Sequence, residues 1–397
     1  MKIAELRTFV VGNPPPHHGG RYFVFLQLVT DDGIVGVGEV YAATFHPRVV
    51  EMMIHDVFDR HVVGTDPFHI EALWRRVDTR GYSGRPDVSL VGVLSGVEMA
   101  CWDIVGKAVE KPVYELLGGR VHERLRGYTY IYAEPGDATD VYMDPEFAAI
   151  RAAEYVAQGH TAVKFDPAGH YSTFDPRQPE LAELDRCEAF MRLLREAVGS
   201  RCDLLFGTHG QFTPSGAIRL ARRLEPYGPL WFEEPTPPDS PEEMAKVARA
   251  TSIPIATGER LTTKYEFARV LETGAASILQ MDLGRVGGLL EAKKIAGLAE
   301  AHYALIAPHL YCGPIVGAAN IQLATCSTNF LILEGIKTWG GFYAELLEQP
   351  IVWEDGYVMP PIGPGLGVEL NEDVARTHPY DGADLHLSPA DEPPGFP

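Results

Sequence analysis

Six apolar runs between Leu204 and Glu334 each end in residues that could do chemistry. Their functional ends, which recur every 23 to 27 residues, are Gly207, Glu233, Glu259, Asp282, His309 and Glu334. One strand and one helix of a TIM barrel occupy roughly 25 to 30 residues, because about 250 residues form eight such units. We therefore expect these groups on one rim, where barrel enzymes hold their active sites. The spacing predicts an enzyme.

Glu233 and Glu259 are carboxylates at the ends of neighbouring predicted strands. A single glutamate there could equally be a surface residue or a helix cap. Two of them, one barrel unit apart, favour a metal site at the barrel mouth. Hard oxygen ligands suit Mg²⁺, which binds few protein carboxylates together with water and substrate oxygens. The sequence therefore predicts Mg²⁺ as the cofactor, with these two glutamates as ligands.

His309 and Asp282 end two further neighbouring runs. A carboxylate that accepts a hydrogen bond from one imidazole nitrogen orients the ring and raises its pKa, which makes a general acid or base. The alternative is a core histidine whose ring bonds to the backbone. We favour the catalytic pair because both residues follow buried strands on the same rim.

His209 and Lys164 follow the third and second predicted strands. Lys164 could supply positive charge for a substrate carboxylate, or act as a base if burial lowers its pKa. A solvated lysine is the alternative. Glu334, on the eighth strand, is a candidate hydrogen-bond partner for the substrate or an intermediate.

The composition limits the kinds of partner that the protein can bind. The formal charge of −20 disfavours nucleic acid, which needs a basic face. No apolar run approaches the roughly 20 residues of a transmembrane helix, and the N-terminus lacks a signal-peptide pattern, so we expect no membrane partner. The five cysteines are scattered without CxxC spacing and predict reduced core thiols in a cytoplasmic protein.

A 397-residue chain is long enough for a barrel and a second domain. We predict an α+β domain at residues 1–125, a barrel at 126–350 and a C-terminal segment at 351–397 that packs back on the first domain. The barrel begins with runs at 127–132 and 162–166. Capping boxes are predicted at Ser240 and Thr263. In the first domain, strands are predicted at 3–11, 22–29 and 34–40, and helices at 46–60, 67–79 and 90–109.

The motifs resemble those of the enolase superfamily, in its mandelate racemase and muconate lactonizing enzyme branch. They are similar in particular to galactonate and gluconate dehydratases, which act on acid sugars. The motifs that carry the resemblance are Glu233-Glu234-Pro235, Gly258-Glu259-Arg260, Asp282 with Gly287-Gly288, Ala307-Pro308-His309, Gly118-Gly119-Arg120 and Pro364-Gly365-Leu366-Gly367.

The resemblance implies an α/β fold, a modified TIM barrel of (β/α)₇β form under an N-terminal α+β capping domain. It also implies a Mg²⁺-stabilised enediolate and a homo-oligomer, often an octamer. Loops at 13–20 and 80–87 would close over the sugar end of the substrate. The candidate substrate-binding residues are His17, His18, Tyr82 and Arg85 from these loops, and Arg260.

Only part of the family's pattern of site residues is present in this chain. His209 matches the strand-three histidine of galactonate dehydratases. Where the family has an aspartate as its first metal ligand, this chain has Gly207. Asp166, His209 or water could fill that place. Lys164-Phe165-Asp166 replaces the Lys-x-Lys of racemases, which disfavours a two-sided racemase.

The predicted function is Mg²⁺-dependent dehydration of an aldonate to a 2-keto-3-deoxy acid through an enediolate. His209 or Lys164 removes the C2 proton, and His309, held by Asp282, protonates the departing 3-hydroxyl. The alternatives are an epimerase, a lactone cycloisomerase using the same enediolate, or a non-catalytic sugar-acid binder. A binder has no need for the histidine–aspartate pair.

Overall fold

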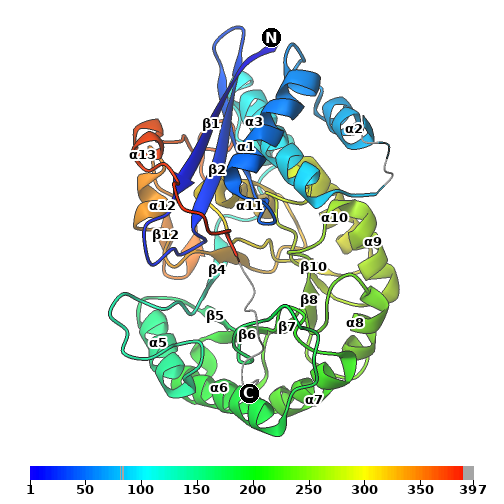
Figure 1. Ribbon diagram of the computed structural model, residues 1–397, viewed down its shortest axis with the longest axis vertical. Coiled ribbons are helices and arrows are strands. Elements are labelled where there is room, and N and C mark those ends of the chain that lie inside the picture. The colour runs from blue at the N-terminus through cyan, green and yellow to red at the C-terminus, as the bar shows by residue number, and fades with distance from the viewer. Residues whose placement is uncertain (81, 83–84, 388–397) are drawn as a thin grey trace.

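The computed structural model describes residues 1–387 except 81, 83 and 84. The described chain forms an N-terminal α+β domain and a barrel of parallel strands. In Figure 1 the N-terminal domain lies above the barrel. This architecture confirms the predicted (β/α)₇β barrel with a capping domain. The five cysteines are buried and free, as expected for core thiols.

The N-terminal domain is built on an antiparallel sheet in the order β1-β2-β3. The turn between β2 and β3 contains Gly33 with a φ of +90°, a conformation that favours glycine. The element ranges agree to within a few residues with those predicted. They are β1 (Ile3–Gly12), β2 (Tyr22–Thr30), β3 (Val35–Val40), α1 (Pro47–Val57), a π-helical turn η1 (Phe58–Val62), α2 (Ile70–Arg80), α3 (Val88–Ala108) and α4 (Val113–Leu116).

Helix α3 is the central helix of this domain. β3 runs so close to it that a Cβ added at Gly38 would lie 1.9 Å from the carbonyl oxygen of Gly96. The helix is long and apolar enough to cross a membrane, so the prediction that no apolar run approaches that length was wrong. However, 83% of its apolar window is buried inside the protein, as is typical of a core helix.

Within the described residues, eight parallel strands, β4 to β11, form the barrel in chain order, and seven helices, α5 to α11, cover its outside (Figure 1). Pairing of β11 with β4 and a bridge between Ile306 and Phe330 close the ring. The strands are β4 (Leu125–Tyr130), β5 (Ala162–Phe165), β6 (Asp203–Gly207), β7 (Trp231–Glu233), β8 (Ile255–Thr257), β9 (Ile278–Leu279), β10 (Leu305–Ile306) and β11 (Leu333–Gly335). The helices are α5 (Pro145–Ala157), α6 (Leu181–Val198), α7 (Pro214–Leu224), α8 (Pro241–Ala248), α9 (Thr263–Thr273), α10 (Gly288–Ala301) and α11 (Pro314–Thr325).

The two predicted capping boxes are formed only in part. Ser240 is the N-cap of α8, followed by Pro241, but its side chain makes no capping hydrogen bond. At α9 the cap is Thr262 rather than Thr263, which is the first residue of the helix and donates its N–H to the carbonyl of Val286. Glu266 then accepts the backbone N–H of Thr262 at 2.6 Å, one residue earlier than predicted.

Buried carboxylates of the capping domain hold the starts of two barrel helices. Glu39 on β3 accepts the backbone N–H groups of Gly313 and Val316 at the start of α11. Glu98 on α3 accepts those of Leu289 and Leu290 at the start of α10, at 2.7 and 2.8 Å. Helix N-termini leave N–H groups unsatisfied and favour negative charge. Carboxylates of the capping domain therefore cap two barrel helices across the interface between the domains.

The C-terminal part returns to both domains. After the short helix α12 (Phe342–Glu345), a hairpin of β12 (Trp353–Glu354) and β13 (Tyr357–Val358) pairs with β4 in antiparallel fashion. Helix α13 (Glu372–Thr377) then packs against β1, where it is drawn in red in Figure 1. The domain boundaries at residues 125 and 350 stay predictions.

Replacing Glu39 by alanine is expected to lower the free energy of unfolding by about 2 to 4 kcal/mol, because two buried N–H groups of α11 lose their acceptor. Chemical denaturation of the purified protein measures this. The control is Glu272→Ala on the exposed face of α9, which should change stability by less than about 0.5 kcal/mol. Equal stability of both variants would mean that the cross-domain cap contributes nothing.

Candidate active site

A compact apolar cluster inside the barrel determines how far along the barrel axis the site lies. It takes one residue from each strand or its immediate flank: Tyr128, Ala162, Leu205, Trp231, Ala256, Ile278, Ala307 and Ile332. Side chains alternate between the two faces of a strand, so the residue two places later points the same way, nearer the C-terminal mouth. The residues at that next height include Lys164, Gly207, Glu233, His309 and Glu334. Five predicted positions thus share one layer.

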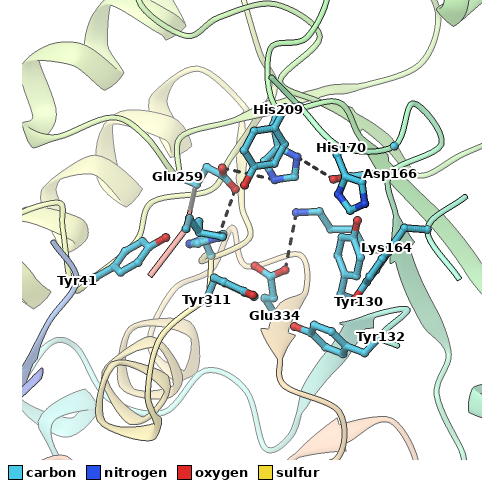
Figure 2. Close-up of a pocket in the computed structure, with 15 residues that line it drawn as sticks. Tyr41, Tyr130, Tyr132, Lys164, Asp166, His170, His209, Glu259, Tyr311 and Glu334 are labelled. Carbon is cyan, nitrogen blue, oxygen red and sulfur yellow. Dashed lines mark ion pairs between the residues drawn. The ribbon is translucent and has the colours of Figure 1, made fainter. Parts of the chain in front are cut away.

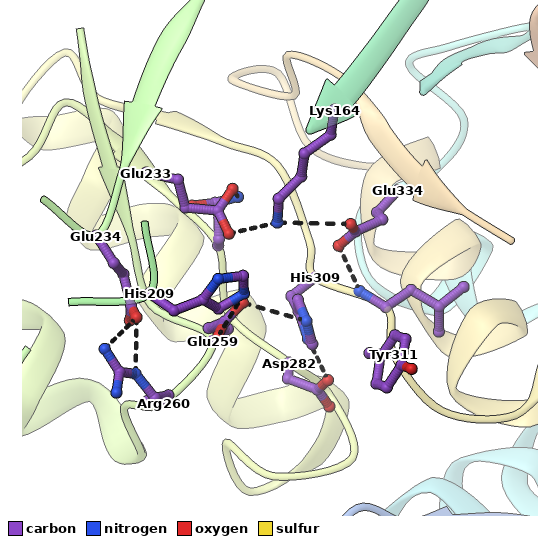
Figure 3. A network of polar contacts seen from close by, with 12 residues as sticks. Lys164, His209, Glu233, Glu234, Glu259, Arg260, Asp282, His309, Tyr311 and Glu334 are labelled. Carbon is purple, nitrogen blue, oxygen red and sulfur yellow. Dashed lines mark hydrogen bonds and ion pairs between the residues drawn. The ribbon is translucent and has the colours of Figure 1, made fainter. Parts of the chain in front are cut away.

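Lys164 and Glu233 form a buried ion pair at the bottom of the site (Figure 3). The Lys164 Nζ lies 2.5 Å from Glu233 Oε1 and 3.8 Å from Glu334 Oε1. Burial opposes the charge on Lys164, yet Glu233 and Glu334 raise its pKa above the usual value. Lys164 therefore stays protonated in this arrangement.

Glu233 and Glu334 are oriented by further donors. Glu233 Oε2 accepts from Trp231 Nε1 at 3.1 Å and from Gln280 Nε2 at 2.7 Å. Burial raises the pKa of the Glu233 carboxyl, and the Lys164 ammonium opposes that rise. Glu334 Oε2 accepts the backbone N–H of Leu310 at 2.8 Å. Each carboxylate thus has a fixed rotamer facing the lysine.

His309 and Asp282 form a buried pair on one side of the site (Figure 3). His309 Nδ1 lies 2.7 Å from Asp282 Oδ2, and Asp282 Oδ1 accepts the N–H of Gly284 at 2.8 Å. The other ring nitrogen, Nε2, lies 3.3 Å from Glu259 Oε2. Burial would lower the pKa of His309, but Glu259 and Asp282 raise it to about 9. The ring can therefore hold a proton and present it on Nε2.

A second histidine–carboxylate pair lies opposite the first and was not predicted. His209 Nδ1 lies 2.8 Å from Asp166 Oδ2, while Nε2 lies 3.7 Å from Glu259 Oε1 (Figure 2). Burial lowers the pKa of His209, but Asp166 and Glu259 outweigh this and raise it to about 9. The same two histidines hold the pKa of Glu259 well below its usual range against the effect of burial. Glu259 thus stands between two oriented imidazoles.

Ligand atoms of His209, Glu233 and Glu259 lie within 4.8 Å of one another. Glu259 Oε2, which lies 3.3 Å from His309 Nε2, is buried and accepts no hydrogen bond, and the same holds for Asp166 Oδ1. The two carboxylates around such oxygens fit a divalent cation such as Mg²⁺, with the imidazole beside it. A Cβ added at Gly207 would lie 3.1 Å from Asp166 Oδ1 and 3.5 Å from Glu233 Cβ. A side chain at residue 207 would therefore reach the same place. The structure brings His209 into the cluster, with Asp166 behind its ring.

Six of the fifteen residues that line the pocket are tyrosines, and the sequence analysis did not select them. The cavity has a volume of about 240 Å³, and both His209 and His309 line it. Tyr130 stands two places after Tyr128 of the apolar cluster, which is the signal that could have found it. The tyrosines come from separate strands and loops: Tyr41, Tyr130, Tyr132, Tyr142, Tyr171 and Tyr311. Hydroxyl groups on aromatic walls suit a polyhydroxylated ligand.

The predicted substrate-binding residues lie outside the lining of this cavity. His18 contacts the carbonyl of Ala133 at 3.1 Å and packs on the ring of Tyr132, which does line it. Arg260 binds Glu234 through Nε at 2.7 Å, and Glu234 is fully buried.

The loop residues of the capping domain lie further away. The ring of His17 turns to the carbonyl of Asn13, and Tyr82 and Arg85 are exposed. Three residues of their predicted loop, Gly81, Ser83 and Gly84, lie outside the described residues. Their predicted roles, like that of Arg260, stay predictions.

Two family models match the chain. Residues 17–118 match the N-terminal domain of mandelate racemase and muconate lactonizing enzyme, and residues 148–374 match an enolase C-terminal domain-like model. These stretches carry the capping domain and most of the barrel.

Similar proteins span almost the whole chain. A D-galactonate dehydratase from Ralstonia nicotianae is 36% identical over 382 residues, which cover 94% of this chain and 93% of that protein. A D-xylonate dehydratase from Haloferax volcanii is 33% identical over 391 residues, or 97% and 90% of the two chains. A crystal structure from Labrenzia alexandrii, assigned to mandelate racemase and muconate lactonizing enzymes, is 66% identical with a TM-score of 0.96. It covers 98% of this chain and 100% of that one.

The metal cluster predicts how Mg²⁺ affinity should change. Gly207→Asp adds an anionic oxygen beside Glu233 and should tighten Mg²⁺ binding about tenfold. Asp166→Ala removes the buried Oδ1 that lies nearest the place of the missing side chain, and should weaken binding about tenfold. Calorimetric titration with Mg²⁺ gives both values without turnover. Unchanged affinity in both variants would mean that water fills the place of the missing aspartate.

Proposed function

The chain belongs to the mandelate racemase and muconate lactonizing enzyme family, and we propose that it is a hydro-lyase that dehydrates a sugar acid. Its substrate would be an aldonate and its product a 2-keto-3-deoxy acid, formed through an enediolate. The relatives named D-galactonate and D-xylonate dehydratase support this class of reaction. The observation that carries the proposal is the pair of oriented histidines, His309 and His209, facing each other across Glu259.

Substrate binding needs positive charge, because the chain carries a formal charge of −20 and the substrate is an anion. Lys164 provides a fixed cation at the bottom of the pocket. Glu233 and Glu259 are the residues that would hold Mg²⁺, and the imidazole of His209 lies beside them with Nε2 free for proton transfer. When bound, the ion supplies the positive charge that stabilises an enediolate. The carboxylate end of the aldonate would therefore lie at this end of the pocket.

Elimination of water needs one base and one acid. Because Asp166 and Glu259 raise the pKa of His209 to about 9, the ring must first lose its own proton. In that neutral form, oriented by Asp166, its Nε2 takes the C2 proton of the aldonate. His309, protonated and oriented by Asp282, gives its proton to the 3-hydroxyl, which leaves as water. The resulting enol becomes the 2-keto-3-deoxy acid. Lys164 is the weaker candidate for the base because Glu233 and Glu334 keep it protonated.

The facing histidines also suit an epimerase, which removes a proton on one side of the carbon and returns one on the other. The geometry of His209 and His309 favours this alternative over a lactone cycloisomerase. The two reactions differ in their products, since an epimerase retains every oxygen of its substrate.

A library of aldonates incubated with the protein and Mg²⁺ should yield a 2-keto-3-deoxy acid from at least one member, visible by NMR of the product. A chelator should stop the reaction and added Mg²⁺ should restore it, because the enediolate loses its stabilising charge. Recovery of a C2-inverted acid instead would establish the epimerase, and no product from any aldonate would contradict the proposed substrate class.

His309→Asn should reduce turnover about 10³-fold, because asparagine fills the space but transfers no proton. His302→Asn, at the exposed end of α10, is the control and should leave turnover unchanged. If His309 is the acid, the variant still exchanges the C2 proton with D₂O. Loss of exchange in His309→Asn but not in His209→Asn would reverse the two roles. An active His309→Asn enzyme would make His309 a structural core residue.

A further inference from the structure

The described end of the chain is held firmly against the capping domain. Tyr380 donates its N–H to the carbonyl of Val10 at 2.9 Å, and Pro379 forms an antiparallel bridge with Val11. The ring of Tyr380 packs on that of Tyr22, with centroids 4.8 Å apart. The segment from His378 to Leu387, which we call the tail, therefore extends the β1 edge and then turns toward the barrel mouth.

His386 locks the tail beside the site. It is 5% exposed, and its Nε2 donates to the carbonyl oxygen of Tyr311 at 2.7 Å. Its ring lies 5.2 Å from that of Tyr41 and 5.5 Å from that of Tyr311. A Cβ added at Gly20 would come within 1.8 Å of His386 Cε1. Because Gly20 has no side chain, there is space beside it for the imidazole of His386.

The next residue, Leu387, lines the proposed active-site pocket together with Tyr41, Tyr311 and His309. It is the one lining residue from beyond residue 350 in the part of the chain that the structure describes. The same wall reaches the catalytic pair, because the ring of Tyr41 stacks on that of His309 at 6.2 Å. The family models end at residue 374, before the tail begins.

The two ends of the pocket differ in chemistry. Lys164 and Glu259 stand at the strand ends, where the proposed function places the substrate carboxylate. Tyr41 directly follows β3 of the capping domain and Leu387 ends the described tail, so this part of the lining comes from outside the barrel. The side chain of Leu387 is hydrocarbon and the residue is 37% exposed, so the side chain can exclude atoms there but cannot bond to a hydroxyl.

We propose that Leu387 is a specificity-determining residue that limits the length of the sugar acid at the capping-domain side of the pocket, and that His386 is the residue that positions it. This inference rests on the proposed function for the class of ligand. It assigns the length limit to a segment far in sequence from the strand ends that carry the reacting groups.

Leu387→Ala removes three carbon atoms from the wall. One methylene in an apolar pocket is worth roughly 10- to 200-fold in selection. The affinity of a six-carbon aldonate relative to a four-carbon aldonate should therefore rise about tenfold. Calorimetric titration of the full chain with four-, five- and six-carbon aldonates in Mg²⁺ measures this without turnover.

Ile362→Ala is the matched control, because Ile362 loses the same atoms, is 82% exposed and lies outside the pocket. It should keep the wild-type affinity ratio. His386→Ala should shift the ratio in the same direction as Leu387→Ala, and the double variant should shift it no further, since both act through one side chain.

An unchanged ratio in Leu387→Ala overturns the inference, even if all affinities fall together, because a merely structural tail would act on every ligand alike. Binding with the expected ratios but without dehydration would contradict the proposed reaction and leave this inference standing. A wild-type chain that binds none of the three aldonates overturns both.

Discussion

The two-residue period of a β-strand inside a closed barrel is the constraint on which the site depends. Each strand places one side chain in the apolar cluster and the residue two places later at the mouth. Trp231 links the two heights directly, because its ring packs in the cluster while its Nε1 donates to Glu233. Core packing thus determines the positions of Lys164 and Glu233, whereas the reaction determines which residue types are needed there.

Charge balance is the second requirement that the site meets. Buried carboxylates are costly unless opposite charge or hydrogen-bond donors surround them. Glu259 is flanked by His209 and His309, and Glu233 by Lys164. The groups that keep these carboxylates ionised are the same ones that move or attract protons in the proposed reaction. Stability and chemistry therefore draw on one set of ion pairs.

The sequence predicts the parts of the site that follow from strand period and misses those that follow from loops. Barrel architecture and the strand-end location of Glu233 and His309 are readable because apolar runs repeat. The pairing of His209 with Asp166 is not, since both lie past their strands and His209 has a φ of +45°. Leu387 could not be predicted for another reason, because no local sequence pattern shows which distant segment completes a pocket.

The helix caps that cross the domain interface set an order of assembly. The capping domain is synthesised first, and domains generally begin to fold as they emerge. Glu39 and Glu98 nevertheless lack their N–H donors until the chain reaches residues 289 and 313. These donors start α10 and α11, the helices that follow the strands of Asp282 and His309. The first domain therefore completes its core only as the catalytic pair forms. In a ribosome-bound fragment without the barrel, Glu39 would lack its two backbone donors and Glu98 would keep only the indole N–H of Trp102.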